Sequence, residues 1–205
     1  FLKRLCLAAP ALAWMTPAWA RESDLAPRTV DLDFLSDEME VVRRRYWTQV
    51  APRPWRLRPA CGFSRITVHH NGSKANYHTA KSTVIRDLDG VLTSHLDRNY
   101  GDIGYHFVLD YAGRVWEGRS LAFEGAHVSR ENEHNIGIML QGNFEMQKPS
   151  EIQAFALKRL VSLLRKRFVI SRDLVYGHRD IGASVCPGQY LYRHVVTIRR
   201  LNAIG

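Results

Sequence analysis

Two residues eight positions apart, His178 and Cys186, are well suited to bind one metal ion. Imidazole nitrogen and thiolate sulfur are both good zinc ligands, and a short loop lets both side chains face the same ion. A third ligand is available from His69 or His70, which end an apolar run. Two histidines and one cysteine leave the fourth tetrahedral position open to water, which is typical of a catalytic zinc site rather than a structural one.

The first twenty residues differ from the rest of the chain. Lys3 and Arg4 precede an apolar stretch over residues 5–14, and small residues, Ala18 and Ala20, occupy the cleavage positions. This layout predicts an export signal over residues 1–20, by the general secretory or the twin-arginine route, and it is too short for a membrane anchor. We therefore expect a periplasmic or extracellular protein with no stable membrane anchor after the signal is removed.

The cysteines allow a second interpretation of Cys186. Removal of the signal takes away Cys6 and leaves Cys61 and Cys186, which could pair in an oxidising compartment. The spacing from His178 and the Pro-Gly pair at 187–188 favour a metal loop, so we expect Cys61 to be a small buried or free thiol.

The composition is that of one globular domain with extensions: 205 residues, 45% hydrophobic and 24% charged. The net charge is +9, and removing the signal takes away two of the 29 basic residues and none of the 20 acidic ones, which leaves +7. Such a balance suits an anionic polymer. Because an exported protein rarely meets nucleic acid, the charge favours the cell wall as a partner and argues against nucleic acid.

The pattern along the chain predicts a single α/β domain, with a central mixed β-sheet flanked by helices, over residues 61–205. An N-terminal extension over residues 21–60 precedes it, with a helix capped by Ser36 and running to Tyr46, and then a proline-rich connector. Expected strands span 66–70, 105–110, 114–117, 136–140 and 174–176, and expected helices span 82–98 and 190–201. A further helix opens at Ser150, with Ile152 and Phe155 among its core-facing residues.

The chemically useful residues lie at the ends of these strands. His69 and His70 end the first strand, Tyr105 and His106 begin the second, and His178 follows the last. Because open α/β sheets usually present ligands at strand ends, these residues are expected to meet at one edge of the sheet.

Five stretches together resemble the zinc amidase family, which includes the peptidoglycan recognition proteins and the amidase-type phage lysozymes. They are VHHN at 68–71, DIGYHF at 102–107, GAH at 125–127, NIGI at 135–138 and GHRD to CPG at 177–188. The resemblance covers residues 60–200 in order and with matching spacing, so it is more specific than a lone motif. It implies the fold of the peptidoglycan recognition proteins.

The resemblance also implies N-acetylmuramoyl-L-alanine amidase activity, with Zn²⁺ held by His69, His178 and Cys186. His70, next to His69 in a strand, should point to the opposite face. Tyr105 would orient the attacking water or support the oxyanion. Ser184 stands where many relatives carry Lys or Thr, so it would be a weaker donor to the oxyanion.

For substrate binding, the resemblance implies groove-wall residues and peptidoglycan or muropeptides as the partner, and we expect the protein to be a monomer. Those residues are His127, Asn135, Trp116 and Arg119. The alternative function is a non-catalytic peptidoglycan-binding module of the same fold. Non-catalytic relatives characteristically lose the metal cysteine, so the presence of Cys186 favours the enzyme. A zinc peptidase is disfavoured because the chain lacks a His-Glu-x-x-His sequence.

Overall fold

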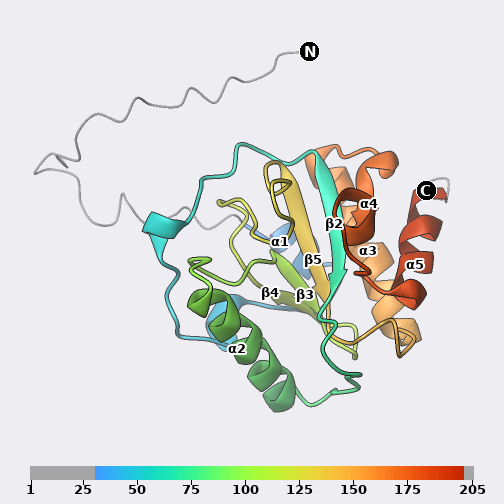
Figure 1. The fold of residues 1–205 in the computed structure, drawn as a ribbon, viewed down its shortest axis with the longest axis horizontal. Coiled ribbons are helices and arrows are strands. Elements are labelled where there is room, and N and C mark those ends of the chain that lie inside the picture. The colour runs from blue at the N-terminus through green and yellow to red at the C-terminus, as the bar shows by residue number, and fades with distance from the viewer. Residues whose placement is uncertain (1–30, 201–205) are drawn as a thin grey trace, which may run out of the picture.

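A six-stranded sheet with the order β1-β4-β3-β5-β2-β6 organises the computed structural model, which describes residues 31–200 (Figure 1). The strands are β1 Val41–Val42, β2 Arg65–His70, β3 Phe107–Leu109, β4 Val115–Glu117, β5 Asn135–Leu140 and β6 Val175–Gly177. β3 and β4 form an antiparallel hairpin, and every other pairing is parallel. The predicted mixed sheet is therefore confirmed. The predicted export signal with Cys6, and the first part of the extension, lie outside the described residues.

The helices follow the expected order along the chain. They are α1 Asp33–Ser36, α2 Lys81–Asp97, α3 Glu151–Phe168, α4 His178–Ile181 and α5 Gln189–Arg200. Three short 3-10 turns, η2 Arg44–Tyr46, η3 Pro54–Arg56 and η4 Arg172–Leu174, complete the set. Among these described helices, none combines the length and the apolar character that a membrane span requires.

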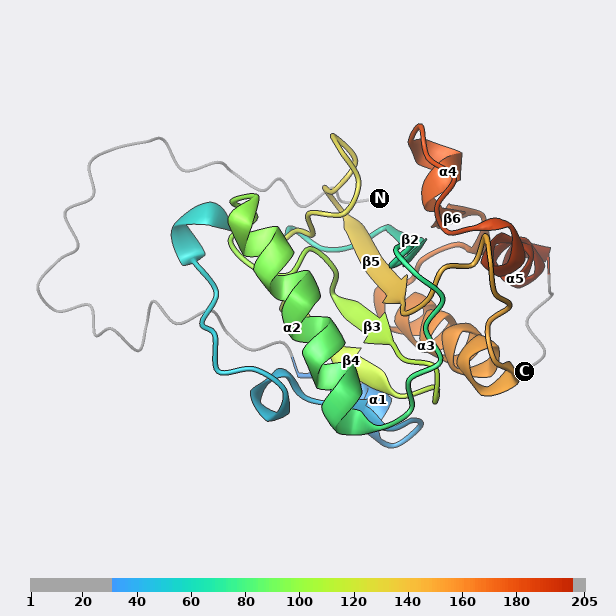
Figure 2. The same ribbon diagram turned by 60° about the horizontal axis from the view of Figure 1, so that its bottom comes forward.

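The sheet lies between two layers of helices (Figure 2). Alternate residues of a strand point to opposite faces. Ile136, Ile138 and Leu140 of β5 therefore pack on the face covered by α3 and α5, whereas Met139 packs on the face covered by α2. In β2, Ile66 and Val68 belong to the α3 face. The same alternation puts His69 on the α2 face.

Parallel pairing brings the ends of β2 and β6 together. β2 lies between β5 and β6, and the register aligns Val68 with Ile138 on one side and with Gly177 on the other. All but the first residue of β2 are buried, as expected for a central parallel strand. Because His178 directly follows Gly177, the last turn of chain after β6 places it beside His69.

The helix predicted over residues 36–46 is wrong. The segment instead contains the short α1, the strand β1 and a 3-10 turn. Val41 and Val42 are β-branched and pair in parallel with Val115 and Trp116 of β4, so the sheet edge outweighs the helical pattern. Leu35 is fully buried in the core, so this part of the extension packs as part of the sheet domain.

Helix α3 begins where expected, but its buried face differs from the expectation. The Ser150 hydroxyl accepts a hydrogen bond from the Gln153 amide at 3.1 Å and caps the helix. Ile152 and Phe155 are 57% and 68% exposed, so the expectation that they face the core is wrong. The buried face includes Gln153, whose amide donates to the Leu109 and Gln141 carbonyls.

One position at the end of α3 generates a stability prediction. Val169 has φ of 55°, in the left-handed region, and its side chain is 91% exposed. A β-branched residue there is strained and gains little from packing, so Val169→Gly should stabilise the protein by about 1 kcal/mol, raising Tm by about 2–4 °C. Thermal unfolding measures the shift. Val50→Gly, at an exposed valine without positive φ, should lower Tm, and an equal rise in both variants would contradict the explanation.

Candidate metal centre

Three side chains from separate segments converge on one point. His69 lies near the end of β2, His178 begins α4 directly after β6, and Cys186 lies in the loop between α4 and α5. Their ligand atoms all lie within 4.8 Å of one another. The Cys186 Sγ is 3.7 Å from His69 Nδ1, and the two imidazole centroids are 4.7 Å apart.

The chemistry of these donors fits zinc. Ligand lengths of about 2.3 Å to sulfur and 2.0 Å to nitrogen put tetrahedral S and N ligands about 3.5 Å apart, close to the observed separation. Burial lowers the pKa of His69 well below its usual range and also lowers that of His178, so both stay neutral and can donate lone pairs. Burial raises the pKa of Cys186 to about 12, so a cation beside the sulfur is needed to hold it as a thiolate at neutral pH.

The two other cysteine interpretations are settled by the structure. Cys186 is a free, buried thiol, which excludes the alternative disulfide with Cys61. Cys61 is exposed, so the expectation of a buried thiol there is wrong.

An open cavity of about 640 Å³ gives access to this centre. The following residues line it: His69, His70, Asn71, His95, Arg98, Tyr100, Tyr105, Ala126, His127, Val128, Ser129, Arg130, Asn132, His178 and Cys186. It therefore runs from the end of β2 past the end of α2 to the loop after Gly125. All three ligand residues border the cavity, so the centre is open on one side.

Tyr105 stands beside the centre. Its ring centroid lies 5.2 Å from that of His69, and it directly precedes the short stretch into β3. Burial raises the pKa of the phenol above its usual value, so the hydroxyl stays protonated at neutral pH and can donate a hydrogen bond. His70 points the other way, as strand alternation predicts, because its Nδ1 accepts from the Phe144 amide at 3.1 Å.

The other predicted residues take different positions. His127 lines the cavity, and its Nδ1 lies 3.0 Å from His69 Nε2.

Asn135 is fully buried and binds Thr67 and the Glu131 carbonyl. Trp116 is also fully buried, and its indole donates to Asp110. Both side chains therefore pack inside the protein rather than on a groove wall.

Ser184 contacts the metal-ligand loop itself. Its Oγ accepts a hydrogen bond from the Cys186 amide at 3.1 Å, and Ser184 is not among the residues around the cavity. In this arrangement the serine orders the backbone that carries the cysteine ligand.

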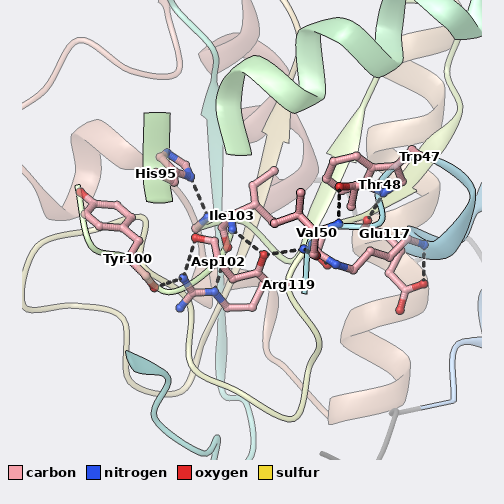
Figure 3. A network of polar contacts seen from close by, with 12 residues as sticks. Trp47, Thr48, Val50, His95, Tyr100, Asp102, Ile103, Glu117 and Arg119 are labelled. Atoms are coloured by element: carbon pink, nitrogen blue, oxygen red, sulfur yellow. Dashed lines mark hydrogen bonds and ion pairs between the residues drawn. The ribbon is translucent and has the colours of Figure 1, made fainter. Parts of the chain in front are cut away.

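Arg119 is a buried clamp for the loop before Tyr105 (Figure 3). Its guanidinium donates to the carbonyls of Tyr100, Asp102, Ile103 and Glu124 at 2.7–3.1 Å. Burial lowers its pKa to about 10, still well above neutrality. All these partners are backbone carbonyls, so in this arrangement Arg119 fixes the loop instead of reaching a ligand.

The same network ties the N-terminal segment to this loop. Arg44 forms an ion pair with Asp102 at 2.8 Å, and the Trp47 indole donates to the Glu117 carbonyl at 2.8 Å. On the other side of the loop, His95 of α2 accepts from the Gly104 amide at 2.8 Å. Both sides of the backbone that leads to Tyr105 are thereby held (Figure 3).

A second cavity of about 650 Å³ adjoins the first and shares Tyr100, Ala126, Arg130 and Asn132 with it. Exposed arginines, Arg56 and Arg58, line this second cavity. Sequence reasoning missed these residues, and it also missed Arg98 and Asn132. A basic or amide side chain in a loop carries no periodic signal, so only the tertiary structure shows that they share a groove.

Comparison with known proteins identifies a family and relatives of this chain. The family model described as N-acetylmuramoyl-L-alanine amidase matches residues 60–189. Peptidoglycan-recognition protein SC2 of Drosophila melanogaster is 32% identical over 136 residues, covering 65% of this chain and 73% of that protein.

Solved structures agree on the fold. The crystal structure of Drosophila peptidoglycan recognition protein SD superposes with a TM-score of 0.70 at 26% identity, covering 80% of this chain and 95% of that one. The ectodomain complex of peptidoglycan recognition proteins LCa and LCx with tracheal cytotoxin gives a TM-score of 0.68 at 26% identity. The superposition covers 76% of this chain and 93% of the chain in that complex.

Substitution of Arg119 can distinguish a structural role of this residue from a role in ligand binding. Arg119→Lys cannot satisfy all four carbonyls and leaves buried acceptors without donors, so the free energy of unfolding should fall by about 2–4 kcal/mol. Urea unfolding measures it. Arg119 and the exposed Arg58 both line the second cavity, and Arg58→Lys should change the free energy of unfolding by less than about 0.5 kcal/mol. Equal stabilities, with ligand binding lost only in Arg119→Lys, would instead make Arg119 a ligand contact.

Proposed function

The chain belongs to the N-acetylmuramoyl-L-alanine amidase family, and on that premise we propose that it is a zinc-dependent amidase. It hydrolyses the amide between N-acetylmuramic acid and L-alanine of peptidoglycan stem peptides. The single observation that carries this proposal is the cluster of His69, His178 and Cys186 at the wall of an open cavity.

The three ligands would hold the ion with one position free. When bound, zinc supplies a Lewis acid for the scissile carbonyl and lowers the pKa of a water molecule. The neutral imidazoles of His69 and His178 and the sulfur of Cys186 donate the lone pairs. Because all three residues line the cavity, an ion that they held would be accessible from it.

Tyr105 is the side chain placed to assist the reaction. A protonated phenol beside the centre can donate a hydrogen bond to the oxygen on which negative charge develops. The residues lining the cavity in the described part of the chain include no carboxylate. We therefore assign to the Tyr105 hydroxyl the orientation of the attacking water and support of the oxyanion.

The substrate class follows from the family and from the charge of the groove. The relatives named above are peptidoglycan recognition proteins, and one of their complexes contains tracheal cytotoxin. Arg98 and Arg130 border the metal cavity, and Arg56 and Arg58 border the adjoining one. Arginines outnumber the two carboxylates of the adjoining cavity, Glu124 and Glu133, so the groove complements the carboxylates of stem peptides, which guanidinium groups bind well. We propose that a monomer, exported to the periplasm or beyond the cell, acts on peptidoglycan or muropeptides.

The second candidate function is recognition without cleavage. The named relatives carry recognition rather than hydrolysis in their names, and the fold alone serves both functions. The complete three-ligand set, including Cys186, favours the enzyme.

Incubation of the purified chain with a defined muropeptide, followed by mass spectrometry, tests the proposal. Free stem peptide should appear with zinc, disappear with a chelator and return when zinc is restored. Cys186→Ser replaces a soft ligand and should lose at least about 10²-fold in activity even in added zinc. His194→Gln, at a partly exposed histidine on α5, should retain activity. An intact muropeptide in the presence of the zinc-loaded protein would establish the binding module instead.

The role of Tyr105 has its own test. Tyr105→Phe keeps the ring beside His69 but removes the hydroxyl, so kcat should fall about 10²-fold because one oxyanion donor is lost. Zinc content, measured by elemental analysis, should stay the same. An unchanged kcat would remove the tyrosine from the reaction.

A further inference from the structure

His127 contacts a metal ligand through one ring nitrogen and the backbone through the other. Its Nδ1 lies 3.0 Å from His69 Nε2, and its Nε2 lies 3.1 Å from the Asn135 carbonyl oxygen. The ring planes of His69 and His127 are nearly perpendicular, at 81°. One imidazole therefore bridges the metal centre and strand β5.

The direction of these two hydrogen bonds follows from the carbonyl. A carbonyl oxygen only accepts, so His127 Nε2 carries the proton, and the Nδ1 of the neutral ring is an acceptor. His69 must then donate from Nε2, which leaves the lone pair on its Nδ1, the atom 3.7 Å from Cys186 Sγ.

The position of the His127 ring is built into the backbone. A Cβ added at Gly137 would lie 2.4 Å from His127 Cδ2, and one added at Gly125 would lie 2.3 Å from the same atom. Both separations are too short for real side chains, so the imidazole occupies a slot that exists because both residues are glycines. The His127 amide is held as well, since it donates to Asn132 Oδ1 at 2.8 Å.

We propose that His127 is a positioning residue that fixes the tautomer and the orientation of His69, so that His69 Nδ1 is the metal-binding atom. This role rests on the zinc site of the proposed function, and it differs from the substrate contact expected from the sequence. Partners that orient a ligating histidine typically change metal affinity 10–100-fold when removed.

Zinc affinity of the whole chain, measured by chelator competition without substrate, tests the role. His127→Phe keeps the ring in the glycine slot but removes both hydrogen bonds, so the zinc dissociation constant should rise about 10–100-fold. His127→Asn can place Oδ1 near the position of Nδ1 and accept from His69, so it should lose less than His127→Phe. A dissociation constant unchanged in His127→Phe overturns the proposal.

A buried histidine beside it provides the matched control. His106 is fully buried, and its ring centroid lies 6.1 Å from that of His127. Its two ring nitrogens bond to the Phe123 carbonyl and the Gly137 amide, and neither contacts a metal ligand. His106→Phe should therefore weaken the fold without a comparable loss of zinc affinity. An equal loss in both variants would reduce the effect of His127 to general destabilisation.

Two further measurements do not depend on those substitutions. Gly137→Ala should push the imidazole from its slot and weaken zinc binding in the same direction as His127→Phe.

Two-bond ¹H–¹⁵N NMR of the imidazoles should show protons on Nε2 of both His127 and His69. A proton on His69 Nδ1 in the metal-free protein would overturn the assignment. Tight zinc binding without muropeptide hydrolysis would remove the amidase activity but leave this role intact.

Discussion

The parallel pairing of β2 with β6 is the constraint on which the metal centre depends. It joins segments more than one hundred residues apart in sequence and sets Val68 opposite Gly177, so that His69 and His178 follow side by side. The remaining ligand, Cys186, comes from the loop that returns to the domain as α5. Sheet hydrogen bonds, rather than contacts among the ligands, thus place two of the three donors.

Desolvation gives these donors their chemical character. The same burial that keeps the histidines neutral keeps the Cys186 thiol protonated until a cation enters. It also keeps the Tyr105 phenol protonated, as a hydrogen-bond donor must be. Arg119 in the neighbouring loop is buried as well, and its guanidinium is satisfied by four backbone carbonyls. Groups held by hydrogen bonds of this kind keep their orientation and need not reorganise during a reaction.

Sequence periodicity was sufficient for most elements, and the family resemblance named the three residues that the structure brings together. The alternation in β2 correctly separated His69 from His70, and Ser150 correctly opened α3. The helix prediction over residues 36–46 was wrong because pairing with β4 is a non-local interaction that no local pattern records. The prediction that Ile152 and Phe155 face the core was wrong because the apolar pattern of α3 is compatible with more than one orientation of the helix about its axis.

Burial was the property that sequence predicted least well. Trp116 and Arg119 have side chains that suit a ligand groove, yet the structure uses one for packing and the other as a clamp. The choice depends on which backbone carbonyls lie near a guanidinium, and that is decided by the loop conformation. Conversely, the contact between His127 and His69 could not be inferred from residue types, because it requires two glycines from separate segments.

The short strand β1 has a consequence for solubility. An exposed sheet edge is a template on which another chain can add a strand. Here β1 contributes two residues to that edge, and Arg43, Arg44 and Arg45 follow immediately. So brief a ladder offers an incoming strand few hydrogen bonds, and the exposed Arg45 beyond its end adds a charge that repels a second copy of the same chain. The segment that closes the sheet also protects the protein from edge-to-edge aggregation.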